Sequence, residues 1–393
     1  MLKAVTPRAG MLGTLCGIAL VYIGAVPLAE VFEQPLIGFA SLAIILWGLV
    51  GRFRLPFDMP AGLVALAVGV VIAMILGESR ISADGLGFYP PMPYFGDLVA
   101  GIQHLWANPE LFLVLIPVQI YNFIETMNNV ESAEAAGDEY PVAICQVTDG
   151  AGTMIGALFG SPFPTTAYIG HPAYKRMGAH AGYIIGVGVV IPLAAIFGLL
   201  AFLGDLMPVA AAAPVLVFVA LSLVANTAQS VRPEHMAAVG FAMLPHVSDF
   251  LIVKWGSLIG ALGATGVEGL PSLGDPALTA ALLQQGAHYS GHLALSQGAI
   301  LTGLIWGAIV ASLIDGRFKV AAGFTLAGAA MSSVGIIHGA SLRLPSLEGL
   351  TGGYLIAGAF FLIYPMVLGD RAGERGDPVV DEAAPDPSRA PAE

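Results

Sequence analysis

The feature that most constrains this chain is a series of unbroken apolar runs of about 20 residues, the length that a helix needs to cross a bilayer. Only 11% of the residues are charged, under half of the roughly 25% that soluble domains carry. A transmembrane β-barrel would show shorter strands of about 10 alternating residues. We therefore expect an all-α polytopic membrane protein. The composition excludes a soluble enzyme, a coiled coil and a disulfide scaffold.

Eleven stretches are long enough, or nearly so, to be full spans, and a twelfth, 161–177, is broken by three prolines and a glycine. The eleven predicted spans are 11–31, 34–51, 59–77, 109–129, 141–159, 179–204, 209–230, 235–262, 296–315, 318–340 and 353–369.

The distribution of positive charge predicts whether segment 161–177 crosses the membrane. If it crosses and the N-terminus is cytoplasmic, twelve Lys and Arg residues lie inside and only Arg80 and Arg343 lie outside. If it does not cross, the split becomes five against nine. Because cytoplasmic loops carry the excess of Lys and Arg, we expect 161–177 to cross as a broken half-helix, with both termini cytoplasmic. The acidic tail 370–393 should be disordered.

A polar stripe follows the predicted span 109–129. At 100° per residue, five polar side chains fall within one arc of about 120°. They are Gln119, Asn122, Glu125, Thr126 and Asn129. A carboxylate inside a span is costly, so the stripe should face a protein interior or a water-filled cavity. Glu125 has no basic neighbour in sequence, which favours a proton- or substrate-binding role over a hydrogen-bonded helix seam.

Two further polar segments follow directly. Residues 148–160 place Asp149 ahead of three glycines spaced four apart, a close-packing face, and a capping or snorkelling role for Asp149 competes with a functional one. In 161–172, four helix breakers surround Thr165 and Thr166. They predict an extended stretch that opens a half-helix at membrane depth, as in transporters that hold polar or anionic substrates, rather than a simple proline kink.

These three segments, in this order, resemble the nucleobase–cation symporter (nucleobase–ascorbate transporter) superfamily of xanthine/uracil permeases, and most closely its hypoxanthine/guanine permease branch. Glu125-Thr126 matches a carboxylate followed by Thr, and 149–160 matches Asp-x-x-Gly-Thr-x-x-Gly-Ala-Leu-x-Gly. Residues 165–170 read Thr-Thr-Ala-Tyr-Ile-Gly against Thr-Thr-Ser-Tyr-Ile-Glu. The likeness covers 109–180 well and continues weakly through 213–216. Gly170 stands where the family has a carboxylate, and His171 points about 100° away from that position.

The resemblance implies a fold of two inverted seven-span repeats, each with one broken helix, and a site between the two breaks. It divides the chain into 1–77, three gate-like spans that end the first repeat; 78–108, an outer loop; 109–204, core spans that include 161–177; 205–315, gate-like spans; and 316–369, two additional spans. The first four spans of the family are not matched. We therefore expect the chain not to transport alone, but with a missing N-terminal segment or as a homodimer.

The function that the resemblance implies is secondary active transport across the inner membrane: proton- or sodium-coupled uptake of a nucleobase such as xanthine, uracil or hypoxanthine. The substrate-binding residues would be Glu125, Thr126, Asn122, Thr165, Thr166 and Tyr168, and Glu125 and Asp149 would couple the proton. One alternative is a small-anion transporter of the same fold, because the glycine at 170 leaves the half-helix dipole unopposed. Another is a non-transporting or truncated membrane protein. We predict no enzyme, metal or cofactor, because no nucleophile–base pair or metal-ligand set appears, and no nucleic-acid partner.

Overall fold

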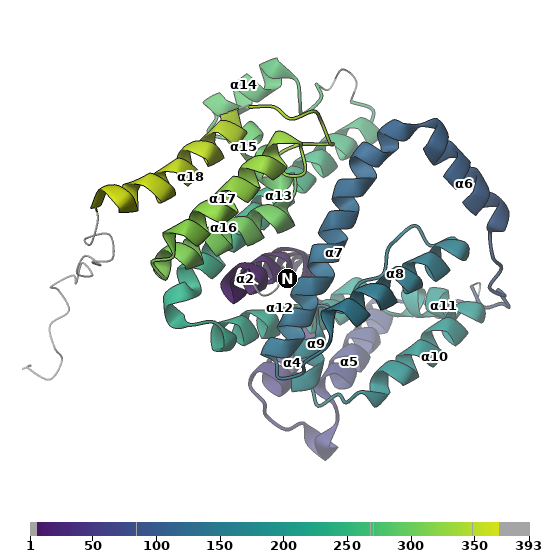
Figure 1. Ribbon diagram of the computed structural model, residues 1–393. Helices are drawn as coiled ribbons and strands as arrows, with labels where there is room; N and C mark the ends of the chain where they lie inside the picture. Colours follow the sequence, from purple (N-terminus) through teal and green to yellow (C-terminus); the bar gives the residue numbers. More distant parts are fainter. Residues whose placement is uncertain (1–5, 84, 268, 270, 348, 369–393) are drawn as a thin grey trace, which may run out of the picture.

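Every regular element in the computed structural model is a helix within the residues that it describes, which are 6–83, 85–267, 269, 271–347 and 349–368 (Figure 1). The predicted all-helical fold class is therefore confirmed. The disorder predicted for the tail 370–393 falls outside the described residues.

Four helices in the described ranges are long and apolar enough to cross a membrane. The first, Arg8–Glu33, joins α2 (Arg8–Ile18), the π-helix η1 (Ala19–Ala25) and α3 (Val26–Glu33). The second is α12 (Val209–Ser230), and the third, Pro233–Ala264, joins η5 (Pro233–His235) to α13 (Met236–Ala264). The fourth is Gly349–Val367, within α18 (Gly349–Leu368). Two bent helix pairs raise the number to six if each is one span. The all-helical chain thus has four to six candidate membrane spans within the described residues, which is compatible with a membrane protein, and the predicted eleven are not confirmed.

Three predicted spans are interrupted where a glycine takes a left-handed backbone conformation. Span 179–204 becomes α10 (Gly182–Ile196) and α11 (Leu199–Leu206), which bend by 92° at Gly198 with φ 72°. At the start of span 296–315, α15 (Tyr289–Ser296) and α16 (Ala299–Ile314) bend by 88° at Gly298 with φ 81°. Span 318–340 stops early, because α17 (Phe318–Ser333) is followed by Gly335 with φ 79°. A left-handed residue ends a helix, so an apolar run does not by itself guarantee one continuous span.

The remaining helices are shorter or more polar. Helix α7 (Phe112–Ala135) is long enough to cross, but its polar stripe makes it less apolar than the four candidates. The predicted outer loop 78–108 contains a helix, α6. The others are α4 (Pro35–Ile45), η2 (Leu46–Val50), η3 (Pro56–Asp58), α5 (Ala61–Leu76), α6 (Phe95–Ala107), η4 (Pro109–Leu111), α8 (Val142–Leu158), α9 (His171–Arg176) and α14 (Pro276–Gln284).

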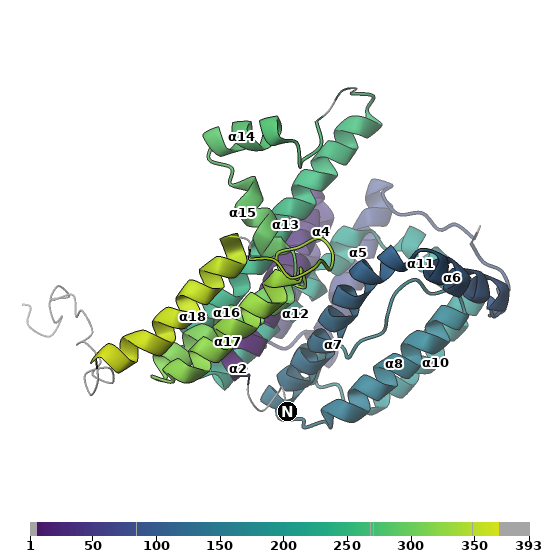
Figure 2. The same cartoon turned by 45° about the horizontal axis from the view of Figure 1, so that its top comes forward.

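Helix α2 lies at the centre of the bundle, against α12, α13 and α16 (Figures 1 and 2). All its residues from Ala9 to Gly17 are buried. A methyl group added at Gly13 would lie 2.9 Å from the main chain of Val239 in α13, and one at Gly10 would lie 2.9 Å from the carbonyl oxygen of Leu304 in α16. Small residues therefore let these backbones approach closely, the usual device of membrane helices.

Helices α8 and α10 lie at the margin of the bundle (Figure 2). They expose apolar side chains along their length, among them Met154, 76% exposed, and Ile185, 73% exposed. Apolar surface of this extent suits contact with lipid or with another protein surface.

Candidate functional site

The three polar segments meet in one cluster around Asp149. Helix α7 supplies Thr126, α8 supplies Asp149, and the non-helical stretch 161–170 supplies Thr166 and Ala167. The Oδ2 atom of Asp149 accepts hydrogen bonds from Thr126 Oγ1 at 2.7 Å and from the main-chain N–H of Ala167 at 3.1 Å. Thr126 has a single hydroxyl proton, which it donates to Asp149. Thr166 Oγ1 lies 2.7 Å from Thr126 Oγ1 and therefore donates to it. A directed chain of hydrogen bonds thus joins the three segments.

The stretch 161–170 runs beside α8 in an extended manner. Thr165 donates its N–H to Thr153 Oγ1 at 2.9 Å and its hydroxyl proton to the carbonyl oxygen of Asp149 at 2.7 Å. Thr165 and Ala167 therefore direct their N–H groups toward α8. In an extended backbone the N–H groups of successive residues alternate in direction, so those of Thr166 and Tyr168 point away from α8. The N–H groups of Thr166 and Tyr168 make no hydrogen bond with any described residue. The stretch presents two free main-chain donors.

The short helix that follows the threonines begins later than the sequence suggested. The extended stretch is present, but α9 starts only at His171, with Pro172 in its first turn, where proline is favoured. Thr165 and Thr166 therefore precede the helix instead of opening it. The donors near the threonines belong to an extended backbone, and the role predicted for the helix N-terminus stays a prediction.

The stripe on α7 divides into two parts. Thr126 and Asn129 are buried, and the Asn129 side-chain amide donates to the carbonyl oxygen of Ala167 at 2.8 Å. Asn122 and Glu125 are half-buried and stay outside the cluster. Within the described part of the chain, the Glu125 carboxylate has no hydrogen bond or ion pair. It is a half-buried carboxylate without a partner, and the roles predicted for Glu125 and Asn122 stay predictions.

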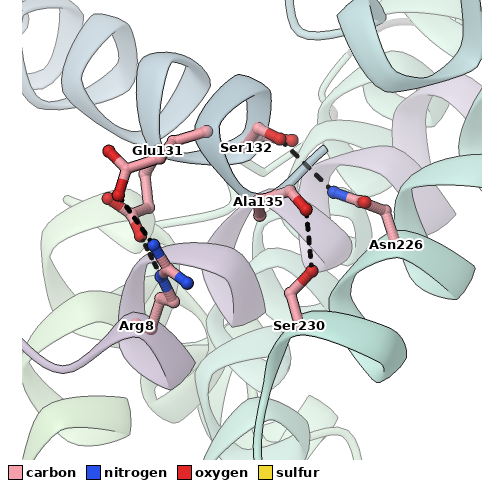
Figure 3. Close-up of polar contacts among 7 residues, drawn as sticks. Arg8, Glu131, Ser132, Ala135, Asn226 and Ser230 are labelled. Carbon is pink, nitrogen blue, oxygen red and sulfur yellow. Dashed lines mark hydrogen bonds and ion pairs between the residues drawn. The ribbon is translucent and has the colours of Figure 1, made fainter. Parts of the chain in front are cut away.

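The last turns of α7 are fastened to α2 and α12 (Figure 3). Arg8 of α2 donates to Glu131, which is 2% exposed, and to Glu134 at 2.8 Å. From α12, Asn226 donates to the carbonyl oxygen of Ser132 at 3.3 Å and Ser230 donates to that of Ala135 at 3.2 Å. These bonds fix the helix that carries Thr126. Sequence reasoning missed them, because no local pattern relates Arg8 to acids more than a hundred residues away.

A cleft of about 690 Å³ opens beside the cluster, and Asn129 and Ala167 belong to both. Its aromatic side chains are Tyr140, Tyr168, Tyr174 and Tyr183. The ring centroids of Tyr168 and Tyr174 are 5.3 Å apart, and those of Tyr174 and Tyr183 are 5.4 Å apart. Only Tyr168 was predicted from the sequence, because the other tyrosines come from separate segments with no shared spacing. Together they offer aromatic faces to a planar ligand.

Charged residues close one side of this cleft. Asp138 Oδ1 accepts a hydrogen bond from Lys175 at 2.9 Å, and His171 Nε2 lies 2.8 Å from Asp138 Oδ2. The bond from Lys175, and next that from His171, hold the pKa of Asp138 below its usual value. His171 is therefore turned toward Asp138, and it does not replace the family carboxylate missing at Gly170.

Comparison of the chain with protein-family models, with curated proteins and with solved structures finds no match. Among the described residues, no group of three or more His, Cys, Asp or Glu is placed to hold a metal ion. The fold and the cluster define an all-helical chain with candidate membrane spans and a polar site between α7, α8 and the stretch 161–170.

Proposed function

We propose that the protein is a secondary active transporter related to the nucleobase–cation symporters, and that it takes up a nucleobase such as xanthine, uracil or hypoxanthine. The observation that carries this proposal is a cleft lined by four tyrosines, one of which, Tyr168, also has a main-chain N–H without a hydrogen bond to any described residue. A nucleobase is a planar ring with carbonyl oxygens and ring nitrogens at its edge. A few main-chain donors next to aromatic faces are what a pocket needs to bind such a ring.

The two threonines have a positioning role in this proposal. The hydroxyl protons of Thr165 and Thr166 are both used within the cluster, so neither hydroxyl donates to a ligand. They hold the stretch so that its free N–H groups face away from α8. An unpaired N–H group at membrane depth costs several kcal/mol, roughly, and an acceptor on the ligand removes that cost.

Glu125 is the residue proposed to take up the coupling proton. It is half-buried on α7 one residue before Thr126, and it has no cation beside it among the described residues. A carboxylate in such a place is neutralised by a proton or by a bound cation. Asp149 was expected to share this role, but two hydrogen bonds to its Oδ2 favour a positioning role.

The finer topology also belongs to this proposal. The split of Lys and Arg between the two sides supports a crossing at 161–177 and cytoplasmic termini. Eleven spans, an inverted repeat and an inner-membrane location belong to the proposal through the resemblance. A small-anion substrate is less favoured, because Asp138 in the cleft pairs with both Lys175 and His171.

Equilibrium binding to the purified protein in lipid nanodiscs tests the proposal. We expect saturable binding of labelled xanthine, uracil or hypoxanthine, and no displacement by sulfate or bicarbonate. Tyr168→Ala should weaken binding about two- to tenfold, the value of one aromatic stack, and Tyr168→Phe should not. Tyr364→Ala is the control, because Tyr364 on α18 is 48% exposed and Tyr168 is 46% exposed.

Three outcomes would contradict the proposal. They are the absence of binding of any base by folded protein, saturable binding of sulfate or bicarbonate instead, and an equal loss of binding in the Tyr364→Ala control.

A further inference from the structure

A second pocket, of about 580 Å³, lies where the end of η2, the loop 51–60 and the end of α9 meet α12. Three arginines line it: Arg52 and Arg54 from the loop and Arg176 from α9. The single carboxylate in the lining is Asp58, which is 3.7 Å from Arg54 and 74% exposed. The lining therefore carries an excess of two positive charges.

Arg52 and Arg176 bring like charges together from distant parts of the chain. Arg52 in the loop and Arg176 at the end of α9 line the same pocket, more than a hundred residues apart in sequence. Two guanidinium groups held in this way repel each other unless an anion lies between them. Arginine suits such an anion well, because its planar fork matches a phosphate group.

Apart from Asp58, Ser222 and Gln229, the rest of the lining is apolar. Its apolar residues include Leu49, Leu55, Met59, Ala61 and Phe218. The pocket therefore combines a cationic mouth with an apolar wall, which suits an amphipathic ligand.

Exposed aromatic side chains lie in the same part of the chain, at the end of η2 and in the loop 51–60. Trp47 and Phe53 are 55% and 57% exposed, and their rings lie 4.8 Å apart. Phe57 is 94% exposed. Aromatic and basic side chains at the end of apolar helices are typical of the headgroup layer of a membrane.

The backbone of the loop is strained at three residues that are not glycine. Arg52 has φ 58°, Phe57 has φ 61° and Asp58 has φ 51°. Strain of this kind costs about 1–3 kcal/mol per residue and is concentrated at functional clamps and ligand sites. Two of the three strained residues, Arg52 and Asp58, line the pocket.

We infer that this pocket binds the headgroup of an anionic phospholipid, with its phosphate against Arg52 and Arg176 and its acyl chains along the apolar wall. Basic pockets between membrane helices on the cytoplasmic side bind anionic headgroups, and the proposed topology places all three arginines on that side. Soluble phosphate has the same charge but would leave the apolar wall uncovered. The inference depends on the topology and not on the identity of the transported substrate.

Lipid binding to the purified full-length chain in detergent, followed by native mass spectrometry, tests the inference. We expect dioleoylphosphatidylglycerol to bind more tightly than dioleoylphosphatidylcholine. Each arginine removed should weaken binding about fivefold, so Arg52→Gln with Arg176→Gln should cost about 25-fold. Arg52→Lys with Arg176→Lys should keep most of the affinity. The control Arg80→Gln removes an exposed arginine outside this pocket and should change nothing.

The inference is overturned if the two lipids bind equally, if the glutamine pair binds like the unmodified chain, or if Arg80→Gln causes the same loss. Full displacement of the lipid by millimolar inorganic phosphate would identify a site for a soluble anion and would also overturn it. If the glutamine pair does not fold, as size-exclusion chromatography would show, Arg176→Gln alone gives the same reading, with an expected loss of about fivefold.

Discussion

Replacement of Thr126 by valine removes the centre of the hydrogen-bond chain without changing the shape of the side chain. Thr126 is fully buried, donates to Asp149 and accepts from Thr166. In the variant, Asp149 Oδ2 keeps only the N–H of Ala167, and the Thr166 hydroxyl loses its acceptor. The substitution therefore unfastens α7 from both α8 and the stretch 161–170.

Two lost bonds set the size of the effect. Hydrogen bonds between membrane helices contribute about 0.6 kcal/mol on average and about 1.7 kcal/mol at most. Valine fills the volume of threonine, so no cavity term is added. We expect Thr126→Val to lower the free energy of unfolding by about 1–3 kcal/mol.

The assay is unfolding in sodium dodecyl sulfate, followed by circular dichroism. Thr148→Val is the matched control, because Thr148 is exposed on α8 and its hydroxyl bonds only to the Ile144 carbonyl oxygen in its own helix, at 2.8 Å. The control should change the free energy of unfolding by less than about 0.5 kcal/mol. Equal losses in the two variants, or no loss in Thr126→Val, would refute the reasoning.

Three further predictions concern other parts of the chain. The hydrogen bonds from Lys175 and His171 that lower the pKa of Asp138 stabilise the fold fully above the unfolded pKa of about 4, and this contribution is lost as the pH falls through the folded value; thermal melts of Asp138→Asn at decreasing pH should not show this loss. Arg8→Gln removes the ion pairs of Arg8 with Glu131 and Glu134 and should lower the free energy of unfolding by about 1 kcal/mol, because Arg8 is 44% exposed; detergent unfolding measures it. Gly17→Ala would place a methyl group 2.6 Å from the His246 ring and should cost about 1–3 kcal/mol in that assay, whereas Gly62→Ala, with nothing within 4 Å, should be neutral or stabilising.

The sequence predicted the grouping of the site better than its geometry. The cost of polar residues in an apolar chain singled out Thr126, Asp149 and Thr166, and the structure brings these three side chains together. The tyrosines of the cleft and the arginines of the second pocket come from distant segments, so their meeting depends on the tertiary fold.

The number of spans was harder to predict, because glycine has two uses in membrane helices. Gly17 stays helical and lets α13 approach α2 closely, whereas Gly198 and Gly298 take left-handed conformations and bend the chain. Nothing in the local sequence separates these cases, and both occur in apolar runs of similar length. The fold class followed from composition, but the breaks within it did not.

In the proposed function, a nucleobase binds in the tyrosine-lined cleft beside the Asp149 cluster, and Glu125 links its binding to a proton. The most direct test is the affinity of the purified protein in nanodiscs for hypoxanthine, xanthine and uracil, measured from acidic to alkaline pH. We predict that one base binds with an affinity that changes with pH, that Glu125→Gln binds it independently of pH, and that the exposed control Glu139→Gln behaves like the unmodified chain. Binding by Glu125→Gln that keeps the full pH dependence, or no binding of any base by folded protein, would contradict the account.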